Sequence, residues 1–291
     1  MTKCLSFHAA YRCRHSGACC RAGWTIPFDH GERETVQTLR LSAGSLTSDG
    51  VASRHDDGTC TFFEADSRLC AIHHAGGHAA LPLSCRMFPR IVLHDGRGTF
   101  ISLSHFCPTA AGLLFDHGAS WPPPDIVDAP STLTGVGLLD GLDARGAWPP
   151  LLRPGVMMDL ESYGAWEHLG VELLTREGIG PELSLDALAS VTTRIAAWSP
   201  GGATPLLHAV RDAFGRLAAA PAKVLDAHEP AVKRWLAARL FGNWIAYQGD
   251  GLEAIVVYLR GGLAIFAAEL ARDGNPREAI RRSDLRIVHQ A

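Results

Sequence analysis

The stretch of sequence that decides the fold of the N-terminal part is Tyr11-Arg-Cys13-Arg-His-Ser-Gly-Ala-Cys19-Cys20-Arg-Ala-Gly-Trp24. The two adjacent cysteines are difficult to close into a disulfide, because neighbouring residues rarely reach the geometry that an S–S bond requires. Gly17 and Gly23 permit a tight backbone on either side of the pair. Loops of this kind let thiolates and backbone N–H groups converge on an ion or a cluster. The stretch therefore favours a metal site over a disulfide.

All eight cysteines lie within the first 107 of the 291 residues. Such clustering indicates disulfides in a secreted protein, whereas in a reducing compartment it indicates metal or cluster ligation, with unconnected thiols as a third reading. The N-terminal residues lack the apolar core of a signal peptide, so we expect a cytoplasmic protein with reduced thiols. The residues expected to bind metal, and to lie close together, are Cys13, Cys19, Cys20, Cys60, Cys70, Cys85 and Cys107.

The spacing of these cysteines does not identify the metal. Four thiolates suffice for one tetrahedral zinc ion or one 4Fe–4S cluster, and no pair shows the two-residue separation of a zinc ribbon or a ferredoxin. His73, His74 and His78 add nitrogen donors in the same region, although a lone histidine is more often a polar surface residue.

Two arginines beside Cys85 are expected to support the site rather than to bind metal. Four or more thiolates around one ion leave excess negative charge, which a guanidinium can offset. We expect Arg86 and Arg90 to donate hydrogen bonds to sulfur or to pair with Glu64 or Asp66. A second expectation concerns Cys107, which precedes a short helix whose N-terminal dipole would lower the pKa of the thiol.

Composition excludes several classes of protein. Hydrophobic residues make up 47% and charged residues 20% of the chain, which is typical of a globular protein. The net charge of −3 argues against a broad phosphate-binding surface, so no nucleic-acid partner is expected. No uncharged apolar run reaches the length of a membrane span, so no membrane partner is expected either.

The chain divides into three parts. Residues 1–120 form the cysteine-rich metal- or cluster-binding domain, and residues 121–155, which hold Pro122-Pro123-Pro124 and Pro149-Pro150, form a linker or strap. Residues 156–291 form a helical domain docked on the first, with any substrate groove at their junction. The fold class is α+β, mainly α: a small cysteine-rich domain with a β-hairpin, followed by a C-terminal helical bundle.

Periodicity and turn residues place the individual elements. A hairpin is expected at 90–94 and 99–103, and Cys60 to Cys70 also suits a short hairpin. Asp250 is a candidate N-cap, with Glu253 at N3, for a helix that follows it. The other helices are expected at 31–41, 108–117, 157–176, 183–197, 203–219 and 231–247.

A glycine-rich segment, Thr134-Gly135-Val136-Gly137-Leu-Leu-Asp140-Gly141, offers the nearest match to a nucleotide-cofactor loop. Because no strong strand precedes it, we interpret it as an ordinary loop. The sequence identifies no catalytic residue and no cofactor-binding residue. It also contains no Gly-x-Ser-x-Gly elbow and no phosphate-binding loop.

The cysteine motifs together resemble the bacterial cysteine-cluster family of zinc- or iron-chelating domains. The resemblance covers about residues 11–115 and rests on Cys13, Cys19-Cys20, Trp24, Cys60, Cys70, Leu81-Pro82, Cys85-Arg86-Met-Phe-Pro89-Arg90, Ser102-Leu103 and Cys107-Pro108 with Ala110-Ala111. Within the family, Gly23-Trp24-Thr25-Ile26 and Cys107-Pro108-Thr109-Ala110-Ala111 look closest to the flagellin lysine-N-methylase branch. Cys4 lies ahead of the matched motif.

The resemblance implies a cytoplasmic metalloprotein with an iron–sulfur cluster, or alternatively zinc or iron ions. It further implies an enzyme that transfers methyl from S-adenosylmethionine to lysine side chains of a protein or peptide. The alternative is a zinc- or iron-binding module or metal carrier without chemistry. A metal-dependent oxidative enzyme is a third hypothesis, but the sequence offers no convincing triad of histidines and carboxylate for it.

Overall fold

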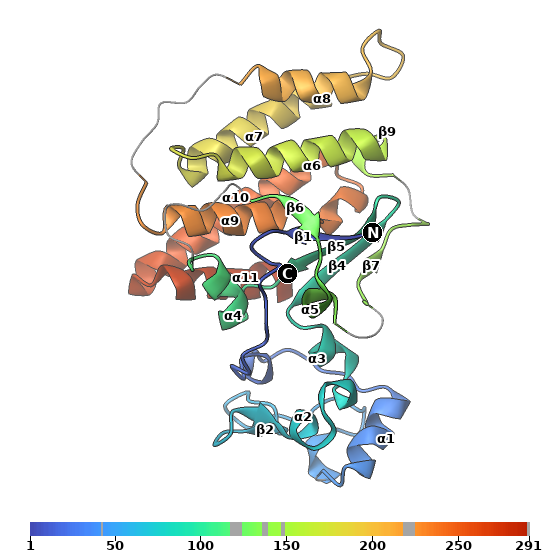
Figure 1. Ribbon diagram of the computed structural model, residues 1–291, viewed down its shortest axis with the longest axis vertical. Coiled ribbons are helices and arrows are strands. Elements are labelled where there is room, and N and C mark those ends of the chain that lie inside the picture. The colour runs from blue at the N-terminus through green and yellow to red at the C-terminus, as the bar shows by residue number, and fades with distance from the viewer. Residues whose placement is uncertain (42, 117–123, 136–138, 147–148, 218–224, 290–291) are drawn as a thin grey trace.

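The computed structural model describes the chain except for residues 42, 117–123, 136–138, 147–148, 218–224 and 290–291. A five-stranded sheet lies in the middle of the molecule (Figure 1). On one side of it lies a lobe formed by residues 12–87, called the cysteine lobe below. The long helices lie on the other side. The expected class, α+β and mainly α, is confirmed.

The central sheet is assembled from distant parts of the chain. Its order is β6-β1-β5-β4-β7, and β1 runs parallel to β5 while β4 and β5 are antiparallel. Asp95 pairs with Gly98 across the two-residue turn, so the hairpin predicted at 90–94 and 99–103 is confirmed. The strands are β1 (Thr2–Leu5), β4 (Arg90–Asp95), β5 (Gly98–Leu103), β6 (Ile126–Asp128) and β7 (Leu142–Asp143).

The proline-rich segment 121–155 differs from a plain linker. It supplies both edge strands of the sheet, β6 and β7, together with α5 (Ser131–Thr134) and β8 (Leu151–Arg153). The described prolines of this segment lie outside its strands, so each strand keeps its backbone N–H groups. Pro122 and Pro123 lie outside the described residues.

The helices lie where periodicity placed them, with changes at their ends. The predictions at 31–41, 108–117, 157–176, 183–197 and 203–219 are confirmed by α1 (His30–Thr38), α4 (Pro108–Leu113), α6 (Leu160–Thr175), α7 (Pro181–Ala196) and α8 (Leu206–Gly215). The remaining long helices are α9 (Glu229–Leu240), α10 (Leu252–Asp273) and α11 (Pro276–His289). Trp166 and Trp235 are fully buried among them.

Two predicted helix ends are wrong. The helix expected at 231–247 stops at Leu240, because the chain turns at Gly242 (φ 60°), whose N–H donates to Glu167 at 2.9 Å. A separate turn, η5 (Trp244–Tyr247), follows it. The N-cap of α10 is Gly251 rather than Asp250, and no side chain caps it. A Cβ at Gly251 would lie 2.6 Å from the Cα of Arg153, so glycine is required for the close approach to β8.

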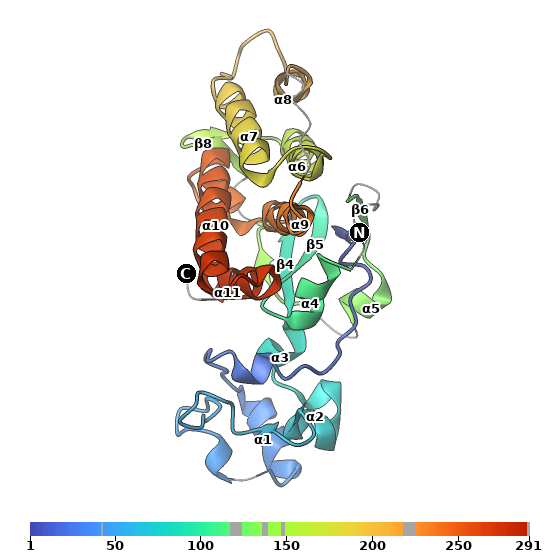
Figure 2. The same ribbon diagram turned by 90° about the vertical axis from the view of Figure 1, so that its left-hand side faces the viewer.

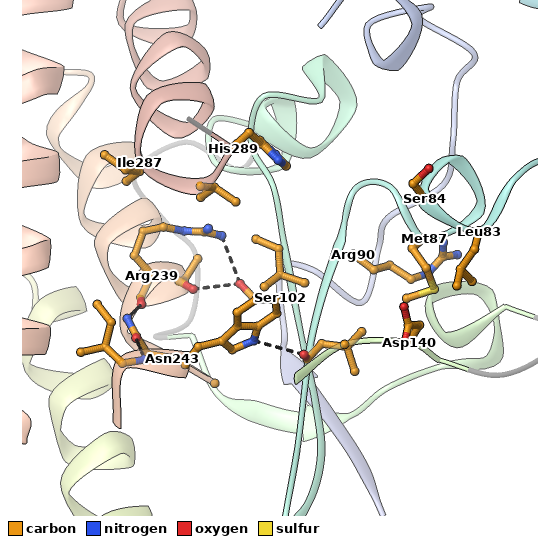
Figure 3. Close-up of a pocket in the computed structure, with 18 of the residues that line it drawn as sticks. Leu83, Ser84, Met87, Arg90, Ser102, Asp140, Arg239, Asn243, Ile287 and His289 are labelled. Carbon is orange, nitrogen blue, oxygen red and sulfur yellow. Dashed lines mark hydrogen bonds between the residues drawn. The ribbon is translucent and has the colours of Figure 1, made fainter. Parts of the chain in front are cut away.

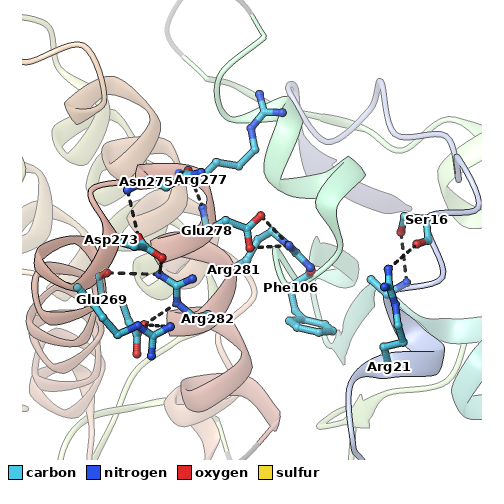
Figure 4. Close-up of polar contacts among 12 residues, drawn as sticks. Ser16, Arg21, Phe106, Glu269, Asp273, Asn275, Arg277, Glu278, Arg281 and Arg282 are labelled. Carbon is cyan, nitrogen blue, oxygen red and sulfur yellow. Dashed lines mark hydrogen bonds and ion pairs between the residues drawn. The ribbon is translucent and has the colours of Figure 1, made fainter. Parts of the chain in front are cut away.

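The last helix, α11, was not predicted and packs against both α10 and α4 (Figure 2). Arg281 donates to the carbonyl of Phe106 at 3.0 Å, and Arg282 pairs with Glu269 and Asp273 at 2.6 Å (Figure 4). By length and composition, one described helix, α10, could cross a membrane. It packs against α7, α9 and α11.

The cysteine lobe has its own apolar core, formed by Ile26, Phe28, Val36, Phe62 and Ile72. Its two-stranded sheet confirms the hairpin expected between Cys60 and Cys70. The elements besides α1 are η1 (Cys19–Arg21), η2 (Ala43–Ser45), β2 (Phe63–Glu64), β3 (Leu69–Cys70), α2 (Ala71–Gly76), η3 (His78–Ala80), α3 (Leu83–Met87). The lobe is joined to β4 directly through α3.

Candidate metal centre and adjoining cavity

Five of the seven cysteines expected to bind metal come together in the core of the cysteine lobe. They are Cys19, Cys20, Cys60, Cys70 and Cys85, called the five-cysteine cluster below. They arrive from four segments: η1, the turn before β2, the end of β3, and α3. The N–H of Cys60 donates to the carbonyl of Cys20 at 2.8 Å, which ties the double cysteine to the hairpin.

Glycine shapes the loop that presents the double cysteine. Gly17 has a φ of 69°, and a Cβ there would lie 2.5 Å from the ring of Phe63. The N–H of Cys20 donates to the carbonyl of Gly17, and Arg21 donates to the carbonyl of Ser16 (Figure 4). The sequence therefore folds this segment into a compact loop that aims its thiols at the hairpin.

The thiols of the cluster act on one another electrostatically. The sulfurs of Cys19 and Cys20 are 3.9 Å apart. A hydrogen bond from Cys20 lowers the pKa of Cys19, and another lowers the pKa of Cys70 to about 7. These hydrogen bonds raise the pKa of Cys20, and burial raises the pKa of Cys85. Hydrogen bonding within the cluster therefore favours the thiolate, the form that binds metal, at Cys19 and Cys70.

The sulfur geometry fits a thiolate-bound metal. With zinc–sulfur bonds of about 2.3 Å, the sulfurs of a tetrahedral site lie about 3.8 Å apart. The distance between Cys19 and Cys20 matches this edge. In the described part of the chain, no three histidine, cysteine, aspartate or glutamate side chains are already arranged to hold an ion. The cluster thus supplies thiol donors, and one pair of them has the separation of a tetrahedral edge.

The other cysteines lie elsewhere. Cys107 is buried beside Tyr11, whose hydroxyl is 3.9 Å from its sulfur, and the exposed Cys13 acts electrostatically on both. Cys4 is fully buried in β1. The expectation for the pKa of Cys107 is wrong, because burial raises it and outweighs the N–H groups of Thr109 and Ala110. The expectation that all seven cysteines lie together is therefore met by five.

The arginines do not contact the partners expected for them. Arg86 pairs with Glu32 at 3.8 Å, and Arg90 donates to the carbonyl of Arg86 at 3.0 Å and to that of Leu133. The expected pairing with Glu64 or Asp66 is wrong, since Glu64 instead contacts Ser67 and His74. A different arginine, Arg54, lowers the pKa of Cys60, although burial raises it more.

Buried guanidinium nitrogens near the cluster lack partners within the described residues. They are one terminal nitrogen of Arg54 and the Nε of Arg86, the residue next to Cys85. Buried N–H donors without acceptors are rare in proteins. Anionic sulfur would satisfy such donors, so their presence agrees with a cluster that carries negative charge.

Three histidines gather beside this cluster. The rings of His15 and His73 are 5.1 Å apart between centroids, and those of His73 and His78 are 6.1 Å apart. His74, the other histidine expected to add a nitrogen donor, instead pairs with Glu64 at 3.4 Å.

A large cavity of about 950 Å³ lies where the cysteine lobe meets the sheet and the helices. Figure 3 shows two groups of side chains facing each other across it. Leu83, Ser84, Met87, Arg90 and Asp140 lie on one side, and Ser102, Arg239, Asn243, Ile287 and His289 on the other. The groove expected at the junction of the two parts is therefore present.

The cavity combines aromatic surface with carboxylates. Phe28, Trp244 and Tyr258 contribute rings to its walls, and Asp29 and Asp140 contribute carboxylates. The indole N–H of Trp244 donates to the carbonyl of Val92 at 3.1 Å, which fixes the ring against β4. Because Arg90 and Arg239 also line the cavity, it offers partners for both positive and negative groups of a ligand with an apolar frame.

The glycine-rich segment contributes to this cavity. Asp140 and Gly141 line it, and a Cβ at Gly141 would lie 2.2 Å from the carbonyl oxygen of Val92. Glycine therefore lets the backbone pass close to β4 beside the cavity. Residues 136–138 of the segment lie outside the described residues.

One tryptophan links the metal region to the cavity. Trp24 follows the double cysteine and packs on His289 and Phe88, with ring centroids 4.7 Å and 4.9 Å apart. His289 lines the cavity and hydrogen-bonds the hydroxyl of Ser104 at 2.8 Å. The loop that carries Cys19 and Cys20 is thus in direct contact with the end of α11.

Residues 12–108 match the CxxCxxCC family. This family is described as a "Putative zinc- or iron-chelating domain". The match supports a metal-binding cysteine-cluster protein, and it contains all five members of the five-cysteine cluster. The comparison with curated proteins and that with solved structures gave no match.

Taken as a spacing of cysteines, CxxCxxCC fits residues 13–20, where three of its four cysteines are present. Ser16 stands where the pattern has its second cysteine. Its hydroxyl accepts a weak hydrogen bond, at 3.5 Å, from the N–H of Ala18. Residues 13–20 therefore offer three thiols where the CxxCxxCC spacing has four.

Glu32 is a supporting residue of the CxxCxxCC segment that sequence reasoning missed. One oxygen accepts the N–H of Leu83, the first residue of α3, at 2.7 Å, and the other accepts the N–H of Asp29 at 3.0 Å. The side chain is 13% exposed. Glu32 thus fixes the helix that carries Cys85. No sequence signal pointed to the contact between α1 and α3, which are about fifty residues apart.

We expect Glu32→Ala to weaken metal binding by about 10–100-fold, as removal of a partner behind the ligands typically does. The matched control is Glu34→Ala on the same helix, because Glu34 is exposed and pairs only with His30 within the described contacts. Competition for zinc with a chromophoric chelator measures both. Equal zinc affinity of the two variants would show that Glu32 does not position Cys85.

Proposed function

We propose that this protein is a cysteine-cluster metalloenzyme that N-methylates lysine side chains of a protein or peptide, with S-adenosylmethionine as methyl donor. The observation that carries the proposal is the cavity, one wall of which is the helix that bears Cys85. The resemblance of the Gly23–Ile26 and Cys107–Ala111 motifs to flagellin lysine-N-methylases supports the choice of reaction.

The metal in this proposal is held by four or five thiolates of the five-cysteine cluster, as an iron–sulfur cluster or as zinc or iron ions. When bound, it supplies folding free energy to the lobe and fixes the backbone around its ligands. Cys85 then holds α3, whose Leu83, Ser84 and Met87 face the cavity. None of the described residues that line the cavity is a cysteine, so this metal shapes the wall and does not touch the substrate.

The cavity suits the two cations that such a reaction joins. Its volume of about 950 Å³ is at the upper end for ligand sites, which leaves room for a cofactor and a lysine side chain. Trp244 and Tyr258 offer ring faces to a sulfonium, and Asp29 and Asp140 offer carboxylates to an ammonium. The lysine ammonium first gives a proton to a carboxylate. The neutral amine nitrogen then attacks the methyl carbon as the carbon–sulfur bond breaks, which leaves a methylammonium and the neutral thioether S-adenosylhomocysteine.

Titration calorimetry with S-adenosylmethionine tests the proposal on the metal-loaded chain. We expect binding to the wild type, and binding about 5-fold weaker to Trp244→Ala, since a ring face contributes on the order of 1 kcal/mol to a cation. Trp198→Ala is the matched control, because Trp198 hydrogen-bonds Thr204 and does not line the cavity. Failure of the wild type to bind the cofactor would exclude the methylase.

A metal-binding module without chemistry is the second candidate, and one observation favours it. The five cysteines lie in an apolar core apart from the cavity, as in structural metal sites. Such a module would keep its metal and bind neither S-adenosylmethionine nor a lysine peptide. Its absorption spectrum separates a brown iron–sulfur protein from a colourless zinc protein.

A further inference from the structure

Three imidazoles meet on the surface of the cysteine lobe, away from the cavity. His15 belongs to the loop before the double cysteine, His73 to α2 and His78 to η3. The rings of His15 and His73 lie 5.1 Å apart between centroids, and those of His73 and His78 lie 6.1 Å apart. His73 is thus in the middle of the group, which we call the histidine group.

These separations match imidazoles that share a metal ion. With metal–nitrogen bonds of 2.0–2.1 Å, a ring centroid lies about 3.2 Å from the ion, and two centroids at a tetrahedral angle lie about 5.2 Å apart. The first pair has this spacing, and the second exceeds it by less than 1 Å. The described side chains are not arranged around one point, so a shared ion requires the three rings to rotate toward it.

The backbone at His15 adopts a conformation that a histidine rarely occupies. Its φ of 49° lies in the left-handed region, and Gly17 follows with a φ of 69°. A side chain other than glycine in this region costs on the order of 1 kcal/mol, and such strain tends to occur at functional sites. Here the strained residue is the one that presents its ring to His73. It also directly precedes Ser16, where the CxxCxxCC pattern has a cysteine.

Two members of the histidine group, His73 and His78, lie where burial favours the neutral imidazole, the form that binds metal. Burial, together with the neighbouring His15 and His78, lowers the pKa of His73, and burial also lowers the pKa of His78. Arg86 and Arg90 act on His78 as well, and their charge disfavours a cation there. We therefore expect weaker binding than at the thiolates.

We propose that His15, His73 and His78 bind one divalent transition-metal ion, at a site separate from the five-cysteine cluster. Imidazole nitrogens select zinc, nickel or copper over magnesium or calcium. The site is independent of methyl transfer, and it stands whether or not the cavity binds S-adenosylmethionine.

Cobalt(II) is the probe, because its spectrum distinguishes sulfur from nitrogen ligands. The full-length chain is first loaded with zinc and freed of weakly bound metal, so that the thiolates are occupied. Added cobalt should then give visible ligand-field bands that saturate at one equivalent per chain. The near-ultraviolet thiolate-to-cobalt band should not appear. Appearance of the thiolate band, or binding of no cobalt, would overturn the second site.

Matched variants assign the ligands. We expect His73→Ala to weaken cobalt binding at least 100-fold, because loss of a ligand costs more than the 10–100-fold loss of an outer partner. His74→Ala, on the same helix but paired with Glu64, should bind cobalt as the wild type does. His78→Ala is a second ligand variant. Because His78 is more exposed than His73, this variant still tests the site if His73→Ala fails to fold. Equal cobalt affinity of the wild type, His73→Ala and His78→Ala would overturn the proposal.

Discussion

Replacement of Cys70 by serine is expected to empty the five-cysteine cluster of metal and to unfold the cysteine lobe. Four cysteines remain, but burial raises the pKa of two of them, Cys60 and Cys85, and the thiol with a pKa of about 7 is lost. Apparent binding free energies of structural zinc sites are on the order of 10 kcal/mol, which exceeds what the small core of Ile26, Phe28, Val36, Phe62 and Ile72 can replace. We expect hydrogen exchange to show loss of protection at the N–H groups of Phe28, Ala52 and Cys60, which are hydrogen-bonded within the lobe.

Hydrogen exchange in the helices on the other side of the sheet shows whether the loss of protection is confined to the cysteine lobe. Amides of α6 and α7 should stay protected, because these helices bury Trp166, Leu174 and Leu188 in a core that contains none of the five cysteines. Treatment of the wild type with a strong chelator should reproduce the same pattern.

The control for this prediction is Cys4→Ser. Cys4 is fully buried in β1, whereas Cys70 is partly exposed, so a purely steric effect would be larger at Cys4. We expect Cys4→Ser to keep its metal, as measured by elemental analysis, and to keep the lobe protected. Wild-type metal content in Cys70→Ser would contradict the assignment of this cluster.

Removal of the Asp284 carboxylate is expected to lower the free energy of unfolding by about 3–5 kcal/mol, the cost of breaking a buried charge pair from one side. Asp284 accepts the indole N–H of Trp235 at 2.8 Å and the backbone N–H of His105 at 2.5 Å. It also lies 3.5 Å from the Nε of Arg239, which is 4% exposed. Asp284→Ala therefore leaves a guanidinium buried without its counter-ion.

Asp273→Ala is the matched control for this second prediction. Asp273 also pairs with an arginine, Arg282 at 2.6 Å, but it is exposed near the end of α10. Exposed pairs contribute up to about 1 kcal/mol, so the control should unfold at nearly the wild-type urea concentration. Urea unfolding of the metal-loaded chain measures both variants. A similar loss of unfolding free energy in the two would show that the buried Asp284 carboxylate contributes no more than an exposed one.

Local patterns in the sequence predicted much of the fold. The hairpin of β4 and β5 and the helices α6, α7 and α8 are encoded by nearby residues, through alternation, glycine turns and helical periodicity. The position of β1 was not predictable in this way, because Thr2 pairs with Thr99 and Lys3 with Asp128. Such pairing depends on the whole chain, and short strands carry weak local signals.

The sequence predicted that the candidate site binds metal through cysteines, but not which of the cysteines lie together. The clustering of cysteines along the sequence identified the metal-binding segment, which the family match supports. It could not separate the five-cysteine cluster from Cys13 and Cys107, because both groups occupy the same stretch of chain. A groove at the junction was expected, but its lining residues escaped prediction, because Asp29, Trp244 and His289 come from three distant segments.

The position of the cysteine lobe within the sheet has a consequence for the order of folding. The whole lobe lies between β1 and β4, so it is an excursion of residues 6–89 out of the sheet. During synthesis β1 appears first and must wait for β5 before it gains its parallel partner. Closing a long unfolded loop is entropically costly and slows folding. Metal bound by the lobe would shorten this loop, so we expect the sheet to form faster in the metal-loaded chain than in the metal-free chain.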